Sequence, residues 1–149
     1  AVTTLPAAIA TGKVLQVVTA NDSTQRDTTS TSFVDVGTLS VSITPSSTSN
    51  KVLVLASTNG RQSSGGDVAY YTIDRNGTNI SPSATSGFSD IQPQTGAATD
   101  NISIAYLDSP ASTSALTYKL QFRNNTGSAT ASANWNTTTG TITVMEISA

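Results

Sequence analysis

The sequence predicts an all-β fold, an antiparallel β-sandwich or jelly roll of about nine to ten strands. Apolar residues alternate with polar ones in short runs, these runs are rich in Val, Ile, Thr and Tyr, and turn residues separate them. No segment keeps the helical spacing of about 3.6 residues over three turns. The 149 residues fit one domain, and we expect a sandwich over 12–149 preceded by an N-terminal arm over 1–11.

In the first half of the chain, strands are expected at 13–19, 33–36, 39–44 and 51–57. The run 39–44 alternates Leu, Val and Ile with Ser and Thr, and Pro45 ends it. The run 51–57 is apolar on both faces over its middle, which predicts a central strand of the core. Its apolar stretch from Val52 to Leu55 is equally compatible with an intersubunit surface.

A β-hairpin is expected where Asn76-Gly77 joins the runs 67–75 and 78–80. Both central residues of a type I′ turn need positive φ, which Asn and Gly adopt most easily. The following segment, 81–98, contains Pro and Gly and few apolar residues, so we expect a long excursion over the surface.

In the second half, strands are expected at 101–107, 116–123, 129–135 and 141–147. The run 116–123 places Leu, Tyr, Leu and Phe on one face, as a half-buried strand does. The run 129–135 is weaker and reads as an edge strand, whereas 141–147 alternates cleanly and closes the sequence.

Reactive side chains are scarce. The chain contains no His and no Cys, only 11% of its residues are charged, and it carries 26 Thr and 22 Ser. Proton transfer, thiolate attack and transition-metal binding therefore have few carriers, and a serine nucleophile would have to use Lys13, Lys51 or Lys119 as its base. We predict a protein that is not an enzyme and that holds no cofactor or metal.

The charged residues also limit the partners. The formal net charge is −2 and the seven Lys and Arg are scattered singly, which argues against nucleic-acid binding. No apolar run approaches the roughly 20 residues that cross a bilayer, so no membrane partner is expected. Six aspartates match no recognised carboxylate motif and are interpreted as solvated turn residues: Asp35, Asp67, Asp74, Asp90, Asp100 and Asp108.

Five blocks of sequence together resemble a known module. They are GKVLQVV at 12–18, TSFVDV at 31–36, ITPSSTSNKVLV at 43–54, YLDSP at 106–110 and ITVMEI at 142–147. In this order they look like a β-sandwich module that recurs in virion proteins of tailed bacteriophages, in tail-fibre tips and head-decorating proteins, especially of aquatic phages. The resemblance implies a non-enzymatic virion component, commonly a homotrimer.

The two settings of this module imply different roles. In fibres it follows a long shaft, whereas here about a dozen residues precede the first expected strand. We therefore expect a capsid cement or decoration protein, seated on the major capsid protein at the outer surface of the head and assembled in the host cytoplasm. Such a protein strengthens the shell through many weak contacts. The alternative is a tail-fibre or head-fibre tip that binds a host-surface glycan.

The segment 1–11 is uncharged and is hypothesised to be an arm that orders against a neighbouring chain. The residues expected to contact that partner are Val2, Leu5, Pro6 and Ile9. The competing interpretation is that the segment packs on its own sandwich or frays.

The glycan alternative rests on Trp135, the single Trp of the chain, and on its neighbours Asn134 and Asn136. An exposed indole ring can stack on a sugar while Asn side chains bond its hydroxyl groups. The other interpretation of Trp135 is an ordinary core or interface anchor.

Overall fold

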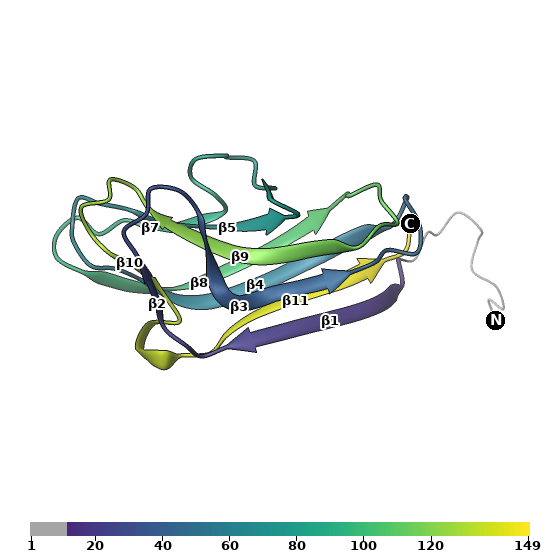
Figure 1. The fold of residues 1–149 in the computed structure, drawn as a ribbon, viewed down its shortest axis with the longest axis horizontal. Coiled ribbons are helices and arrows are strands. Elements are labelled where there is room, and N and C mark those ends of the chain that lie inside the picture. Colours follow the sequence, from purple (N-terminus) through teal and green to yellow (C-terminus); the bar gives the residue numbers. More distant parts are fainter. Residues whose placement is uncertain (1–11) are drawn as a thin grey trace, which may run out of the picture.

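The computed structural model describes residues 12–149, which form eleven β-strands and one short 3-10 helical turn, η1. The strands make two antiparallel sheets that pack face to face, so the predicted all-β sandwich is confirmed (Figure 1). Within this part of the chain, no helix is long and apolar enough to span a membrane.

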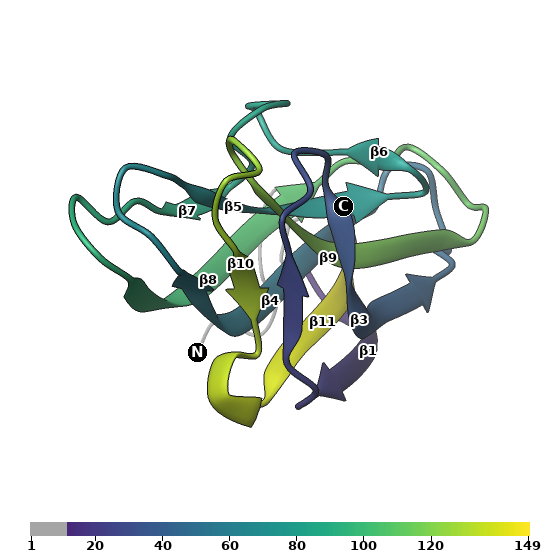
Figure 2. The ribbon, with the colours of Figure 1, turned by 60° about the vertical axis from the view of Figure 1, so that its left-hand side comes forward.

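Six of the strands formed by residues 12–149 make the larger sheet, in the order β1-β11-β4-β10-β2, with β8 on the opposite edge of β4. Their bounds are β1 Val14–Asp22, β2 Arg26–Thr28, β4 Lys51–Gln62, β8 Ala98–Asp108, β10 Ala131–Ala133 and β11 Gly140–Ile147. The expected central position of 51–57 is confirmed, because β4 has neighbours on both edges. Strands β10 and β11 share one edge of β4, and η1 (Trp135–Thr137) projects between them (Figure 2).

The other five strands form the smaller sheet, in the order β3-β9-β5-β6, with β7 beside β5. Their bounds are β3 Val34–Ile43, β5 Ala69–Arg75, β6 Thr78–Asn79, β7 Ser89–Ile91 and β9 Leu116–Asn124. The predicted hairpin is confirmed: β5 pairs with β6, and Asn76 and Gly77 between them have φ of 51° and 85°. These are the two positive φ angles that a type I′ turn requires.

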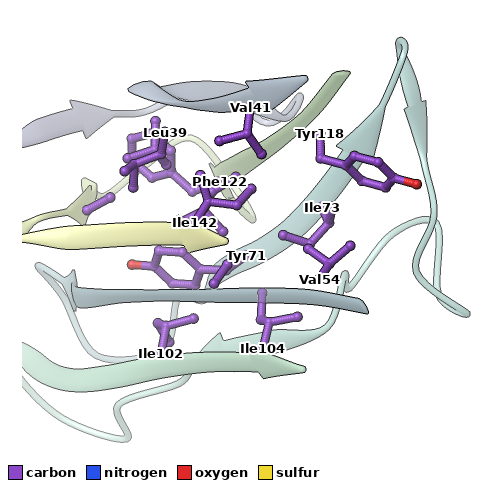
Figure 3. Packing of buried hydrophobic residues seen from close by; sticks show 14 of the residues in the cluster. Leu39, Val41, Val54, Tyr71, Ile73, Ile102, Ile104, Tyr118, Phe122 and Ile142 are labelled. Atoms are coloured by element: carbon purple, nitrogen blue, oxygen red, sulfur yellow. The ribbon is translucent and has the colours of Figure 1, made fainter. Parts of the chain in front are cut away.

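The core lies between the sheets and is filled mainly from alternate residues of the long strands (Figure 3). On β4, Val52 and Val54 are fully buried, and β9 contributes Leu120 and Phe122. The ring of Phe122 stacks on that of Tyr71 from β5, with 6.2 Å between the ring centres. The alternate residues consequently make up the outer face of each sheet.

Several features differ from the sequence-based expectation, and the longest extension is that of β4, which runs to Gln62 instead of ending at residue 57. The runs 33–36 and 39–44 are one strand, β3, and the irregularity in its pairing lies between Asp35 and Ser40. Strands β2 and β7, of three residues each, were not expected, and they form because β10 and β5 offer them backbone partners. Segment 129–135 yields only the short strand β10, which is bonded on both sides rather than at an edge.

Candidate functional site

The expected arm residues, Val2, Leu5, Pro6 and Ile9, lie outside the described residues 12–149. Their contact with a neighbouring chain stays a prediction. The described part of the chain begins at Gly12, two residues before β1.

Trp135 lies in η1, at the larger sheet and only partly buried. The guanidinium carbon of Arg61, from β4, lies 4.4 Å from the centre of the indole ring and covers one of its faces. Asn136 is exposed, and its backbone N–H donates to the side chain of Gln25 at 3.1 Å. A sugar stacking on this ring would therefore have to use the face opposite Arg61.

Asn134 does not fit its expected role as a sugar ligand. Its side chain is fully buried, where its Oδ1 accepts a hydrogen bond from the Thr58 hydroxyl at 2.9 Å and its Nδ2 donates to the Thr24 carbonyl at 3.2 Å. Its backbone N–H donates to the same Thr58 hydroxyl. These hydrogen bonds anchor η1 to the sheet. They also occupy the polar atoms of the Asn134 side chain, which is therefore not available to a sugar.

The outer face of the larger sheet is the most distinctive surface of the described residues. Hydroxyl and amide side chains pair across its strands: Thr19 with Thr143 at 2.9 Å, and Ser57 with Thr141 at 3.0 Å. These groups satisfy one another without any charge. The face is thus covered by neutral polar groups over most of its length.

One end of this face is apolar. The register aligns Val17 of β1, Met145 of β11, Leu53 of β4 and Leu107 of β8 in a single row across four strands. We call these four residues the apolar row. Val17 is 57% exposed and Leu107 is 53% exposed, whereas Met145 and Leu53 are half-buried. Within 52–55, Leu53 and Leu55 are half-buried on this outer face, so the described residues do not fully cover β4 on both sides. An intersubunit surface at this stretch stays a prediction.

Two hollows open on the same face. One, of about 240 Å³, is lined by polar groups that include Asn59, Asn101 and the two threonines that follow η1, Thr138 and Thr139. The other, of about 340 Å³, lies nearer the apolar row and is lined in part by Leu55, Ala105 and Thr143. Both hollows combine hydroxyl groups with apolar atoms. The one lined by Asn59 and Asn101, here called the polar hollow, adds two amide side chains that can bond a ligand.

Behind the apolar row, the inner face of the sheet carries a buried carboxylate. Glu146 is fully buried, and it accepts hydrogen bonds from the Asn50 side chain at 2.6 Å, from the Ser46 backbone and hydroxyl at 2.7 Å each and from Gln16 at 2.5 Å. Burial alone would raise the pKa of Glu146, but these hydrogen bonds outweigh it and lower the pKa to about 2. Glu146 therefore stays ionised inside the sandwich.

Asp108 lies in the same register row as Glu146, with Val52 between them. Its carboxylate accepts a hydrogen bond from Arg75 at 2.6 Å and one from the Tyr118 hydroxyl at 2.7 Å. Burial and the bond to Asp108 raise the pKa of Tyr118 above its ordinary value. The ion pair spans the two sheets, because Arg75 and Tyr118 belong to the smaller one.

The interpretation of the aspartates as solvated turn residues is wrong for three of the six. Asp67, Asp74 and Asp108 are each only 5% exposed. Asp67 accepts bonds from Thr126 and from backbone N–H groups, and Asp74 accepts the N–H of Gly77 in the hairpin. Each of these carboxylates accepts a backbone N–H, as Asp108 does from Ser109, so the buried oxygens have hydrogen-bond partners. Among residues 12–149, no three acidic side chains gather as a metal site would require.

The sequence matches no family model, and no curated protein is significantly similar to it. The fold and the neutral outer face of the larger sheet are therefore the observations from which a function has to be inferred.

Proposed function

We propose that this protein is a non-enzymatic structural component of a bacteriophage virion, a capsid cement or decoration protein. In this role it binds the major capsid protein at the outer surface of the head as a homotrimer, after synthesis in the host cytoplasm. The neutral outer face of the larger sheet is the observation that carries the proposal. It offers a protein partner a broad surface that can be buried without desolvating charges.

The construction of the sandwich supports this role. A cement protein has to keep its shape while it is held at many points, and multivalent binding then makes weak contacts collectively strong. One ion pair with a buried carboxylate, that of Arg75 and Asp108, joins the two sheets. The described part of the chain is thereby suited to act as a rigid block.

Adding the protein back to capsids tests the proposal. Heads of the phage that encodes the chain, prepared without it, are mixed with the full chain and with a variant lacking residues 1–11. We expect the full chain to co-sediment with heads at a fixed number of copies per capsid and to raise the temperature at which the heads release DNA. We expect lower occupancy for the truncated variant, because it lacks the contacts that the arm makes with a neighbouring chain.

Binding should persist at high salt, because the proposed contacts do not depend on exposed charges. Absence of the full chain from heads at every protein concentration would contradict the cement function. Undiminished occupancy of the truncated variant would remove only the arm from the proposal.

The second candidate function is a fibre tip that binds a host-surface glycan. It is favoured by the polar hollow that Asn59 and Asn101 line, next to the threonines that lead to Trp135. Amide and hydroxyl groups bond sugar hydroxyls, and the indole ring offers a surface for stacking. Asn136 remains available to such a ligand, whereas Asn134 does not.

A glycan array separates the two functions. If the protein is an adhesin, the full chain binds a defined group of glycans, and Trp135→Ala abolishes the signal. The matched control is Phe33→Ala. It removes an aromatic ring that lies on the side of the smaller sheet and has the guanidinium carbon of Arg123 5.4 Å from its centre. Equal loss in both variants would indicate damage to the fold, and no glycan signal from the full chain would leave the cement function alone.

A further inference from the structure

At one end of the larger sheet, two carboxylates face inward and the apolar row faces outward, although Lys51 in the terminal row also faces outward. The row of residues that faces inward contains Glu146 and Asp108, which are buried with their hydrogen-bond partners. The next row, which faces outward, is the apolar row. In a half-buried strand the apolar residues normally face the core and the polar ones face water. Stability of the single sandwich does not account for this reversal, because burying a carboxylate costs free energy that an apolar residue would not.

Other exposed apolar residues lie beside the same row. Val14 and Leu15, at the start of β1, are 55% and 48% exposed. Together with Val17 and Leu107 they make up the large apolar side chains that are exposed among residues 12–149. Their concentration at one end of one face, rather than their individual exposure, indicates an interaction surface.

The rest of the face is uncharged over four register rows of β4 and β8. Outward residues there are Leu53, Leu55, Ser57 and Asn59 on β4, opposite Leu107, Ala105, Ser103 and Asn101 on β8. Lys51 and Arg61 bound these rows on β4 and also face outward. Between them, a second copy of the chain would present an equally neutral surface, so no like charges would meet within these rows. A partner with a strongly charged surface would lose the hydration of its charges without gaining an opposite charge here.

The face is also large enough for a stable contact. It is four strands wide at both ends, and β4 runs its full length with twelve residues. With a strand spacing of about 4.8 Å and a rise of about 3.3 Å per residue, its outline measures roughly 19 Å by 40 Å, or about 750 Å², an upper value because only β4 and β8 are paired in the middle rows. Each partner in a standard-size protein interface contributes about 800 Å².

We propose that a second copy of this chain packs on the apolar end of the outer face of the larger sheet, with the apolar row in the contact, and that the polar part of the face remains open to the capsid protein. This inference rests on the self-association in the proposed function and assigns it to a surface. It also explains the reversal: the charges lie inward at this end because the outward side is buried in the assembly.

Two lysine substitutions test the inference, Val17→Lys and Leu107→Lys. Both positions are more than half exposed in the single sandwich, so the variants should fold, as circular dichroism and thermal melting will verify. An unpaired lysine buried in an interface is costly, and we expect each variant to weaken self-association at least about tenfold in sedimentation equilibrium. Thr78→Lys is the matched control, because it places the same charge on the exposed strand β6 of the other sheet.

The outcomes separate this inference from the proposed function. An oligomer that is weakened by both variants and unchanged by the control supports the inference. An oligomer that neither variant weakens overturns the assignment to this face and leaves self-association intact. A chain that is monomeric at every concentration overturns both the inference and the proposed homotrimer, while binding to heads is still decided by the add-back measurement.

Discussion

The outer faces of the two sheets differ in charge and in cover. On the smaller sheet, Lys119 and Asp35 form an ion pair at 2.8 Å, and the guanidinium of Arg123 lies 4.5 Å from the ring centre of Tyr70. Arg123 also donates to the backbone carbonyl of Thr85, so that the excursion after the hairpin is tied to this face. The outer face of the larger sheet has neutral pairs of side chains and the exposed apolar row instead.

This difference shows that the sandwich has two sides with different roles. The smaller sheet uses its charged and aromatic groups within the chain, where they hold a loop and one another. The larger sheet buries the carboxylates of Glu146 and Asp108 on the inner side, and outside it leaves an uncharged surface between Lys51 and Arg61. A surface whose groups have no further partners in the described chain is the one on which an external partner gains most.

The largest effect is expected when the two sides of one strand of the larger sheet are compared. On β8, Ile104 is 4% exposed and faces the core, whereas Leu107 is 53% exposed. We expect Ile104→Ala to lower the free energy of unfolding by about 3 kcal/mol, through lost burial and the cavity left behind. Leu107→Ala should cost less than about 0.5 kcal/mol.

Urea denaturation at low protein concentration measures both values, since a dilute sample reports on the single chain. Comparable losses in the two variants would mean that Leu107 is held within its own sandwich. The apolar row would then not be a free surface, and the contrast between the sheets would disappear.

A second effect concerns the inward charge that keeps the larger face neutral. The pKa of Glu146 is about 2 in the folded protein, below its ordinary value of 4.5, because hydrogen bonds from Asn50, Ser46 and Gln16 outweigh the effect of burial. Between these values the unfolded chain binds more protons than the folded one, so stability is full above about pH 5 and falls as the pH drops toward 2. Glu146→Gln should flatten this decline and lower stability at pH 7 by about 2 kcal/mol.

The measurement is a series of urea denaturations from neutral to acidic pH. The variant should keep a smaller decline, because Asp22 also titrates low: the backbone N–H of Thr24 is the largest of the influences that bring its pKa to about 2. An unchanged pH profile in the Gln variant would show that Glu146 does not depend on these hydrogen bonds.

The strands that could be predicted from the sequence are those whose alternation of apolar and polar residues, or whose turn sequence, matches the burial of their side chains. Strand β9 alternates strictly between buried and half-buried residues. The sequence Asn76-Gly77 is typical of a type I′ hairpin turn and of few other conformations. Strand β2 has no such signal, because Arg26, Asp27 and Thr28 are polar and pair only through their backbones. A strand of this kind is determined by its neighbours.

The buried carboxylates and the apolar row were beyond prediction for a related reason. Glu146 shares the face of Ile142 and Val144 by alternation, but its partners Ser46 and Asn50 lie about one hundred residues away, so the hydrogen bonds that keep it buried have no local signal. Likewise, Leu53 and Leu107 become neighbours only through the strand register. Three of the sequence blocks that carry the resemblance, 12–18, 43–54 and 142–147, contribute residues to the hydrogen bonds around Glu146. These blocks therefore stabilise the fold at this point.

A smaller effect is expected at the polar end of the larger face. Thr137 in η1 has φ of 57°, a left-handed conformation that is unfavourable for a β-branched residue. Thr137→Gly should relieve this strain and raise the free energy of unfolding by about 0.5 to 1 kcal/mol, after allowance for the greater freedom of Gly in the unfolded chain. Thr139→Gly, with no positive φ to relieve, should be neutral or destabilising in the same thermal melts. A loss of stability in Thr137→Gly would mean that its side chain holds the turn.

The smallest effect is expected for the ion pair of Asp35 and Lys119 on the smaller sheet. Its side chains are about 40% exposed, so water and salt screen the attraction, and Asp35→Asn should shift the denaturation midpoint by no more than the scatter of repeated measurements. Burial opposes the charge of Asp35, but the bonds from Lys119 and Gln121 lower its pKa nonetheless, which accounts for an ordered yet weak pair. Denaturation in low and in high salt measures the contribution. A large and salt-sensitive loss would mean that charges stabilise this face, and the two sheets would then differ in what holds them together as well as in what they offer a partner.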